Sequence, residues 1–167
     1  MNLYLKRAVG ALALGLAMSA IGLSTVQAQS RDRVVVLSMA FSAAIDARPF
    51  GDKVFAFMHI RGAIFNESGG GFLHKATTVC RAANDTGNIF GYCEIVDSGG
   101  DQVIMLVQRL AEPDRLSGAG GEFIFISGSG KYANLSGGGT YTIDYQIETD
   151  SKIAHGIVIL EGRYSIR

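Results

Sequence analysis

After Gly51, short apolar segments alternate regularly with glycine-rich turns, and this pattern limits the possible folds more than any other feature of the sequence. The segments are rich in Val, Ile, Phe, Tyr and Thr, residue types that fit the pleated surface of a β-sheet. No segment after residue 30 has a long helical period, although 111–116 and 131–135 could each form one helical turn. The predicted strands are 53–66, 72–84, 88–97, 101–110, 122–127, 139–149 and 153–166.

Short strands joined by tight turns, without crossover helices, predict an all-β fold that is either an antiparallel sandwich or an antiparallel barrel. We favour an antiparallel β-barrel over 51–167, because closure removes the exposed strand edges that a sandwich would present. The preceding segment, 29–50, is predicted to be an N-terminal arm or a first strand, and its most strand-like part is 34–40.

Two of the predicted strands indicate how their faces would be used. In 139–149, polar residues alternate with four apolar or aromatic ones, Tyr141, Ile143, Tyr145 and Ile147, which predicts one wet face and one buried face. In 53–66 both faces are apolar, with Val54, Met58, Ile60 and Ile64 on one and Phe55, Phe57 and Phe65 on the other. A strand that is apolar on both faces favours a partner subunit or an arm packed against the outside of the barrel.

Residues 1–28 have the features of a cleavable signal peptide. Lys6 and Arg7 form the positive start, an uncharged segment follows over 8–23, and Val26-Gln27-Ala28 supplies the small residues before a cleavage site at Gln29. An uncleaved membrane anchor is the alternative, but polar residues follow too early for a spanning helix of about 20 apolar residues. The short, Ala-rich segment looks bacterial, so we expect export to the periplasm or the medium and no membrane attachment after cleavage.

Length and charge bound the remaining possibilities. A chain of 167 residues fits one domain, and 48% hydrophobic residues exclude a wholly disordered chain. With 15 basic and 15 acidic residues, the chain lacks the basic excess that is typical of nucleic-acid binders, so we expect no nucleic-acid partner.

Cys80 and Cys93 are the two cysteines of the chain. They flank a strong turn signal, and a two-residue hairpin loop at Thr86-Gly87 would place them directly opposite each other in a non-hydrogen-bonded pair. In an oxidising compartment we therefore expect a Cys80–Cys93 disulfide that spans one hairpin. A redox role is the alternative, but the chain has no Cys-x-x-Cys motif.

The run Gly128-Ser129-Gly130-Lys131 invites comparison with a phosphate-binding loop. That motif requires a glycine where this chain has Phe125 and a Ser or Thr where it has Tyr132. The dinucleotide motif also needs a helix and a returning parallel strand, which the pattern does not predict. We therefore expect no cofactor site, and we predict a structural role in turns for Gly128, Gly130, Gly137, Gly138 and Gly139.

Side chains that could carry catalysis are scattered along the predicted strands. They are the imidazoles of His59, His74 and His155 and the carboxylates of Glu94, Asp144, Glu148 and Glu161. The carboxylates fit solvated strand faces as well as an acid–base pair, and the histidines and cysteines lack the spacing of zinc ligands. The sequence identifies no catalytic residue, and we expect no metal site.

The segment 121–141 resembles a pattern in secreted bacterial barrels that are grouped with allene oxide cyclase-like and dirigent-like proteins of the calycin type. In that pattern a strand leads to Gly-x-Gly-Lys-aromatic, here Gly128 to Tyr132. A short turn follows, and Gly-x-Gly-Thr-aromatic, here Gly137 to Tyr141, opens the next strand. The resemblance implies an eight-stranded antiparallel barrel, often self-associating, with a largely apolar lumen. The plant cyclases close a ring in a fatty-acid epoxide, and dirigent proteins steer the coupling of phenoxy radicals.

Two functions follow as expectations. The first is a secreted, non-catalytic barrel that binds a small apolar ligand or a protein partner, with self-association into a homo-oligomer as one form of the latter. The alternative is an isomerase or cyclase that acts on a hydrophobic substrate in the lumen, which would require an acid or base inside the barrel with a shifted pKa.

Overall fold

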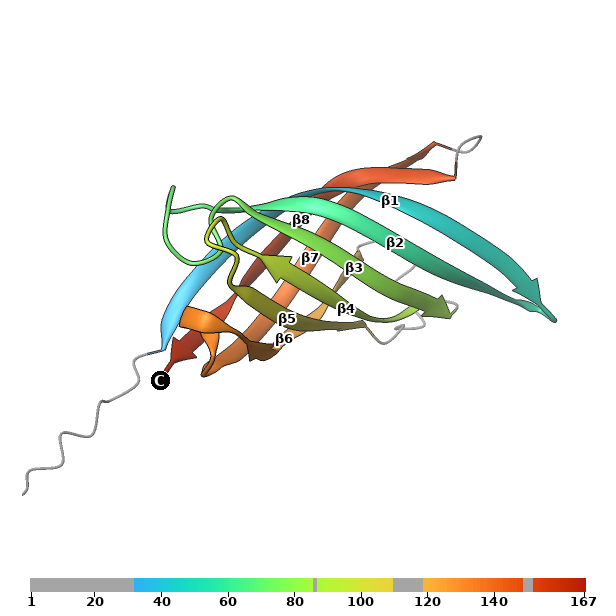
Figure 1. The fold of residues 1–167 in the computed structure, drawn as a ribbon. Coiled ribbons are helices and arrows are strands. Elements are labelled where there is room, and N and C mark those ends of the chain that lie inside the picture. Colours follow the sequence, from blue (N-terminus) through green and yellow to red (C-terminus); the bar gives the residue numbers. More distant parts are fainter. Residues whose placement is uncertain (1–31, 86, 110–118, 149–151) are drawn as a thin grey trace, which may run out of the picture.

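Eight antiparallel strands close into a barrel in the computed structural model, which describes residues 32–85, 87–109, 119–148 and 152–167 (Figure 1). Each strand pairs with the next along the chain, and β8 pairs with β1. The strands are β1 (Arg33–Phe50), β2 (Lys53–Asn66), β3 (Ala76–Asp85), β4 (Asn88–Val96), β5 (Gln102–Arg109), β6 (Ala119–Gly128), β7 (Leu135–Glu148) and β8 (Ile153–Ile166). The predicted all-β, antiparallel barrel is therefore confirmed. No helix in the described ranges is long and apolar enough to cross a membrane.

The predicted strands differ from the observed ones at a few boundaries. β3 starts at Ala76 rather than at residue 72, because Phe72 and Leu73 lie in a loop that covers one end of the barrel and buries both side chains. In 131–135, the expected helical turn is a short 3-10 helix, η1 (Gly130–Tyr132), and β7 begins directly after it at Leu135. The other expected helical turn, 111–116, and the signal peptide, 1–28, lie outside the described residues.

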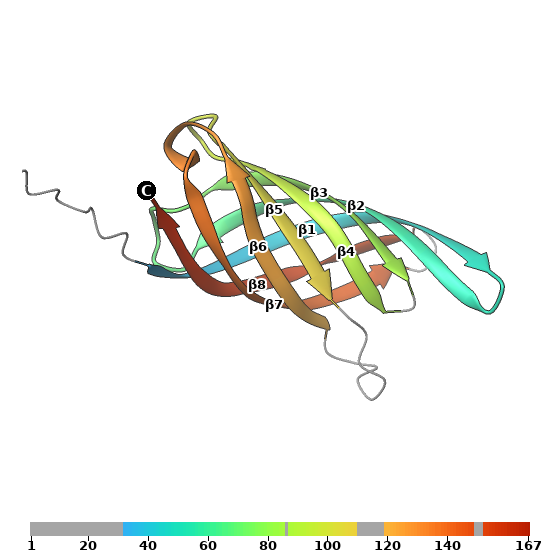
Figure 2. The same ribbon diagram turned by 90° about the horizontal axis from the view of Figure 1, so that it is seen from below.

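Side chains fill one half of the barrel. The N-terminal half of β1 contributes Val35, Leu37 and Met39, and on this side the lumen also contains fully buried Phe123 and Leu160. Loops between β2 and β3, β4 and β5, and β6 and β7 lie at this closed end, together with the last residue of the chain (Figures 1 and 2). The packed half supplies most of the apolar burial that stabilises so small a domain.

The disulfide hairpin follows the predicted register. Cys80 pairs with Cys93 across β3 and β4, and the same register places Asp85 opposite Asn88 at the turn. The two sulfur atoms are bonded, the Cα atoms lie 3.9 Å apart, and both side chains are buried in the core. The disulfide therefore fixes the hairpin from inside the barrel.

Burial decreases toward the opposite end of the barrel. Tyr141 is buried and Ile143 packs partly against the core, but Tyr145 and Ile147, farther along the same face of β7, are 47% and 52% exposed. The prediction that all four would be buried is thus wrong for the last two, because β7 continues past the packed core. The β1–β2 hairpin also extends beyond the other strands at this end (Figures 1 and 2).

Candidate functional site

The open half of the lumen is lined almost entirely by apolar side chains. Register partners across β1, β2, β7 and β8 carry small or aliphatic residues on the inward face at this level. They include Ile45, Ala47, Ala56, Met58, Ile60, Ile143, Ile147 and Ala154. Several of these side chains are half-buried or exposed, so the described residues present an apolar inward-facing surface at this end of the barrel, which we call the apolar mouth.

Two polar side chains, Arg109 of β5 and Tyr141 of β7, face this apolar lumen, and Gly121 of the intervening strand β6 lies between them. Arg109 follows Val103, Met105 and Val107 on the inward face of β5. Gln108, which precedes Arg109, pairs with Glu122 of β6. Because the two strands are antiparallel, Arg109 lies opposite Gly121. Gly121 in turn pairs with Tyr141 of β7.

The absence of a side chain at Gly121 allows the aromatic ring of Tyr141 to lie there. A Cβ atom at this position would stand 2.7 Å from the Cε1 and Cζ atoms of that ring, which is too close for a carbon–carbon contact. Burial raises the pKa of the Tyr141 hydroxyl, while the positive charge of Arg109 acts in the opposite direction. The register places the guanidinium and the phenol on either side of Gly121.

Arg109 is positioned by the turn at the rim. Its Nε atom donates a hydrogen bond of 2.9 Å to the carbonyl oxygen of Gly87, in the turn between β3 and β4. Sequence reasoning missed both Arg109 and the pairing with Tyr141. The alternation in 101–110 already placed Arg109 on the same face as three apolar residues, and this was the signal that could have identified it.

The candidate catalytic side chains named from the sequence are not in the lumen. Glu94, Asp144, Glu148 and Glu161 are exposed and alternate with inward-facing neighbours. On the described inward faces of the eight strands there is no carboxylate and no histidine. The acidic residues that alternate with apolar ones along these strands therefore lie on the solvated outer face of the barrel.

The three histidines do not come together either. His59 and His155 are exposed on β2 and β8, and His155 lies 3.6 Å from a carboxylate oxygen of Glu148. His74 is in the β2–β3 loop rather than on a strand, where its Nδ1 atom accepts a hydrogen bond from the Asn66 backbone. Among the described residues, no three His, Cys, Asp or Glu side chains are grouped so that they could hold a metal ion.

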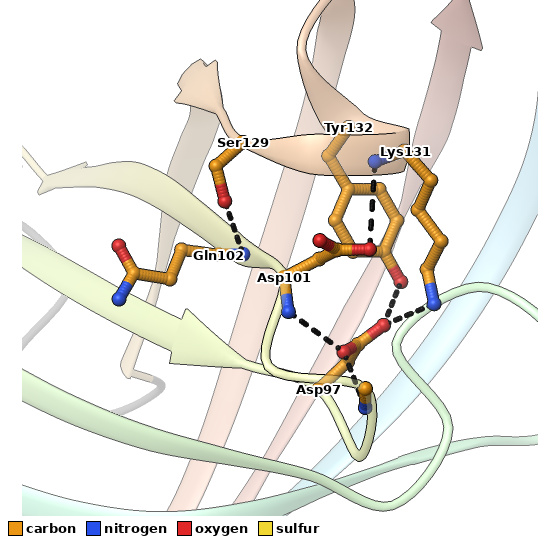
Figure 3. A network of polar contacts seen from close by, with 7 residues as sticks. Asp97, Asp101, Gln102, Ser129, Lys131 and Tyr132 are labelled. Atoms are coloured by element: carbon orange, nitrogen blue, oxygen red, sulfur yellow. Dashed lines mark hydrogen bonds and ion pairs between the residues drawn. The ribbon is translucent and has the colours of Figure 1, made fainter.

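A buried carboxylate at the closed end explains the Gly-x-Gly-Lys-aromatic motif (Figure 3). Asp97 forms an ion pair with Lys131 and accepts a hydrogen bond of 3.1 Å from the Tyr132 hydroxyl. The backbone N–H groups of Gly99 and Asp101 donate to its other oxygen. The hydrogen bond with Lys131, together with these donors, lowers the pKa of Asp97 to about 2.

The geometry of this network indicates that Asp97 stabilises the fold. Asp97 is held ionised by groups that fill its lone pairs, so it has no tendency to take up a proton near neutral pH. Lys131, the residue that would contact a phosphate in a phosphate-binding loop, instead pairs with Asp97. The sequence singled out Lys131 and Tyr132 but did not identify Asp97, which lies more than thirty positions away in the chain.

The five glycines predicted to act in turns occupy two kinds of position. Gly128 ends β6, and Gly130 begins η1 with a φ of +52°. Gly137, Gly138 and Gly139 lie within β7 rather than in a turn, contrary to the prediction. Each of these three glycines allows a close approach of the neighbouring backbone, because a Cβ atom there would collide with a carbonyl oxygen of β6 or β8. Gly162, which pairs with Gly139, leaves room for the Phe123 ring.

A second accessible space lies at the closed end. Its volume is about 380 Å³, and it is lined by the start of β1 and by the β2–β3 loop, including Arg33, Val35, Asn66 and Phe72. Phe72 stacks on Tyr164 of β8 with ring centroids 3.9 Å apart, which closes the barrel beneath this space. This cavity is therefore separate from the apolar mouth at the other end.

Comparison with known proteins yields one structural likeness. No protein-family model matches the chain, and no curated protein matches its sequence. A solved pterocarpan synthase dirigent protein is similar in structure, with a TM-score of 0.45 and 12% sequence identity over 81% of this chain and 87% of that protein. A likeness of this degree assigns neither a family nor an activity to the chain.

Proposed function

We propose that the protein is a non-catalytic barrel that binds a small apolar molecule in the open half of its lumen. The observation that carries the proposal is the exposure of inward-facing apolar side chains beyond the packed core, among them Ile147 at 52% and Tyr145 at 47%. An apolar ligand that covers this inward-facing surface removes apolar area from water, which favours binding. An isomerase or cyclase would need an acid or base in the lumen. The described inward faces carry no carboxylate and no histidine, and burial raises the pKa of the Tyr141 phenol, which keeps it protonated near neutral pH.

Binding of the fluorescent apolar probe N-phenyl-1-naphthylamine tests this proposal. In the variant Ile147→Asp the probe would have to lie against a charge, so we expect its affinity to fall at least about fivefold. Gln146→Asp is the matched control, because the neighbouring residue is exposed on the outer face of the same strand. Equal affinity in wild type and both variants, or no binding of the probe to the wild type, would contradict lumen binding.

Export belongs to the same proposal. The buried Cys80–Cys93 disulfide supports it, because structural disulfides persist in oxidising compartments. We expect the mature protein to begin at Gln29, and amino-terminal sequencing of protein from the periplasm or the medium checks this. Recovery of a chain that still starts at Met1 would contradict it.

Self-association is the form of partner binding that we propose. Large apolar side chains are exposed on the outer faces of β2, β4 and β6, namely Phe57, Phe90, Tyr92, Ile124 and Ile126. Covering these apolar side chains in an interface between subunits removes them from water and lowers the free energy of the protein. Native mass spectrometry of protein from its own host measures the number of subunits and any retained ligand together, and a monomeric mass would contradict self-association.

A further inference from the structure

The open lumen contains a polar site in addition to its apolar wall. Arg109 and Tyr141 occupy one inward-facing row with Gly121 between them, so no side chain separates the guanidinium from the phenol. Their inward-facing neighbours Ile89, Val107 and Ile143 are aliphatic, and the amide of Asn84, one strand beyond Ile89, accepts a hydrogen bond from the Gly87 backbone N–H. A charged donor and a neutral donor thus share a surface whose other side chains, apart from Asn84, are mostly apolar.

Tyr141 makes this arrangement unusual. The side chain is 93% buried, because only 7% of its surface is exposed, yet its hydroxyl has no hydrogen-bond partner among the described residues. The described part of the chain also contains no side-chain oxygen or nitrogen that is both fully enclosed and unpaired. The Tyr141 hydroxyl must therefore still reach open space, and that space is the lumen. A buried tyrosine usually has a partner for its hydroxyl, and here a ligand can supply one.

Arg109 provides the complementary charge. One of its nitrogens, Nε, is used to hold the rim turn at Gly87, which limits the orientations of the guanidinium plane. A guanidinium presents donors in a flat fork that matches a carboxylate, and such charge-assisted hydrogen bonds are the stronger kind. Within an apolar surround, water competes less for these bonds than it does at the outer surface.

We propose that Arg109 and Tyr141 bind the carboxylate of a ligand whose remaining part is apolar and lies in the barrel mouth. This inference rests on the proposed function, since it names the chemical class of the lumen ligand. The apolar part lies against residues such as Ile147 and Met58, and the carboxylate accepts hydrogen bonds from the guanidinium and the phenol. A fully apolar compound of the same shape would leave both donors unpaired and bind more weakly.

A matched pair of fluorescent probes tests the inference on the full mature chain. cis-Parinaric acid and its methyl ester share one apolar chain, and only the acid has a carboxylate. We expect the wild type to bind the acid at least about tenfold more tightly than the ester, as charge-assisted hydrogen bonds imply. Because this comparison uses only the wild type, it does not depend on the folding of any variant.

Variants then locate the preference. Arg109→Gln should reduce the affinity for the acid to that for the ester and leave the ester within about twofold of its wild-type affinity. Tyr141→Phe should produce a smaller loss in the same direction. Arg81→Gln is the control, since Arg81 is an exposed arginine on the outer face of β3 and its loss should leave both affinities unchanged.

The outcomes separate the two proposals. Equal affinities for acid and ester in the wild type, or a preference for the acid that persists in Arg109→Gln, would overturn the carboxylate site and leave lumen binding intact. Failure of the wild type to bind the acid, the ester and N-phenyl-1-naphthylamine would overturn both. If Arg109→Gln does not fold, the wild-type comparison and Tyr141→Phe still decide the question.

Discussion

The two halves of the barrel are built from the same eight strands, but they use their inward-facing residues differently. At the closed end, large side chains such as Phe123 and Leu37 interdigitate, and a loop that carries Phe72 and Leu73 covers the opening. At the open end, the same strand faces continue with Tyr145 and Ile147, which remain about half exposed. The first half therefore accounts for stability, and the second leaves apolar surface that a ligand can cover.

The polar groups inside each half differ in the same way. At the closed end, the carboxylate of Asp97 is surrounded by donors from Lys131, Tyr132 and two backbone N–H groups. Where the packed core meets the open half, the hydroxyl of Tyr141 has no hydrogen-bond partner among the described residues. Complete satisfaction of a polar group is typical of a structural role, whereas an accessible and unpaired one is available for binding.

The largest effect that we expect distinguishes the two halves by stability. Phe123→Ala removes a fully buried ring that lies against Gly162, so it should lower the free energy of unfolding by about 3–5 kcal/mol. Ile147→Ala, at the mouth, should lower it by less than about 1 kcal/mol. Urea unfolding followed by circular dichroism measures both. Similar losses at the two positions would show that the open half is packed in solution.

Loss of the disulfide should have the next largest effect. Replacing both cysteines, as Cys80→Ala with Cys93→Ala, releases a closed loop with a sequence separation of 13 and should cost about 3 kcal/mol in the loop-entropy view. Because the two side chains lie in the packed core, binding of N-phenyl-1-naphthylamine at the mouth should change little at a temperature where the variant is folded. A thiol titration that found two free cysteines in the native wild type would remove the basis of this prediction.

Asp97 gives a prediction that depends on pH. Its pKa is lowered from 3.8 to about 2 in the folded chain, so the ionised carboxylate stabilises the fold. This contribution is fully present above pH 3.8, the unfolded value, and is lost as the pH falls to about 2. Asp97→Asn should therefore cost about 1–3 kcal/mol at pH 7, and the difference from wild type should shrink toward pH 2.

The control for Asp97 is a carboxylate on the outside of the barrel. Glu94→Gln, on the outer face of β4, should change the free energy of unfolding by no more than about 0.5 kcal/mol at pH 7. Unfolding curves at a series of pH values compare the three proteins. A gap between wild type and Asp97→Asn that stays constant over the whole acid range would argue against an ionised structural Asp97.

The smallest expected effect concerns the glycines of the closed end. Gly130→Ala places a side chain at a φ of +52° and against Asp101, so it should destabilise by more than about 1 kcal/mol. Gly70→Ala is the matched control, because a Cβ atom there meets nothing within 4 Å. Thermal melts with and without nucleotide separate a turn from a phosphate loop. Unchanged melting of Gly130→Ala, combined with a nucleotide-dependent shift of the wild type, would favour the phosphate loop.

The sequence by itself determined the class of fold and much of its local geometry. Period-two alternation and glycine-rich turns identified β2 and β8 to the residue, since these signals are local and repeat along each strand. The turn at Thr86-Gly87 determined the register of its hairpin, and with it the pairing of Cys80 with Cys93. Hairpin register depends on residues that are close in the chain, so a single segment contains the information.

Tertiary structure alone decided which inward-facing residues are packed and which polar groups meet. Tyr141 and Ile147 follow the same alternation, but only closure of the barrel and its covering loop place one inside the core and the other at the mouth. Asp97 joins Lys131, and Arg109 approaches Tyr141, across strands that are distant in the chain. Such contacts depend on the register of all eight strands together, because each strand pair adds its own shift to the position of the next.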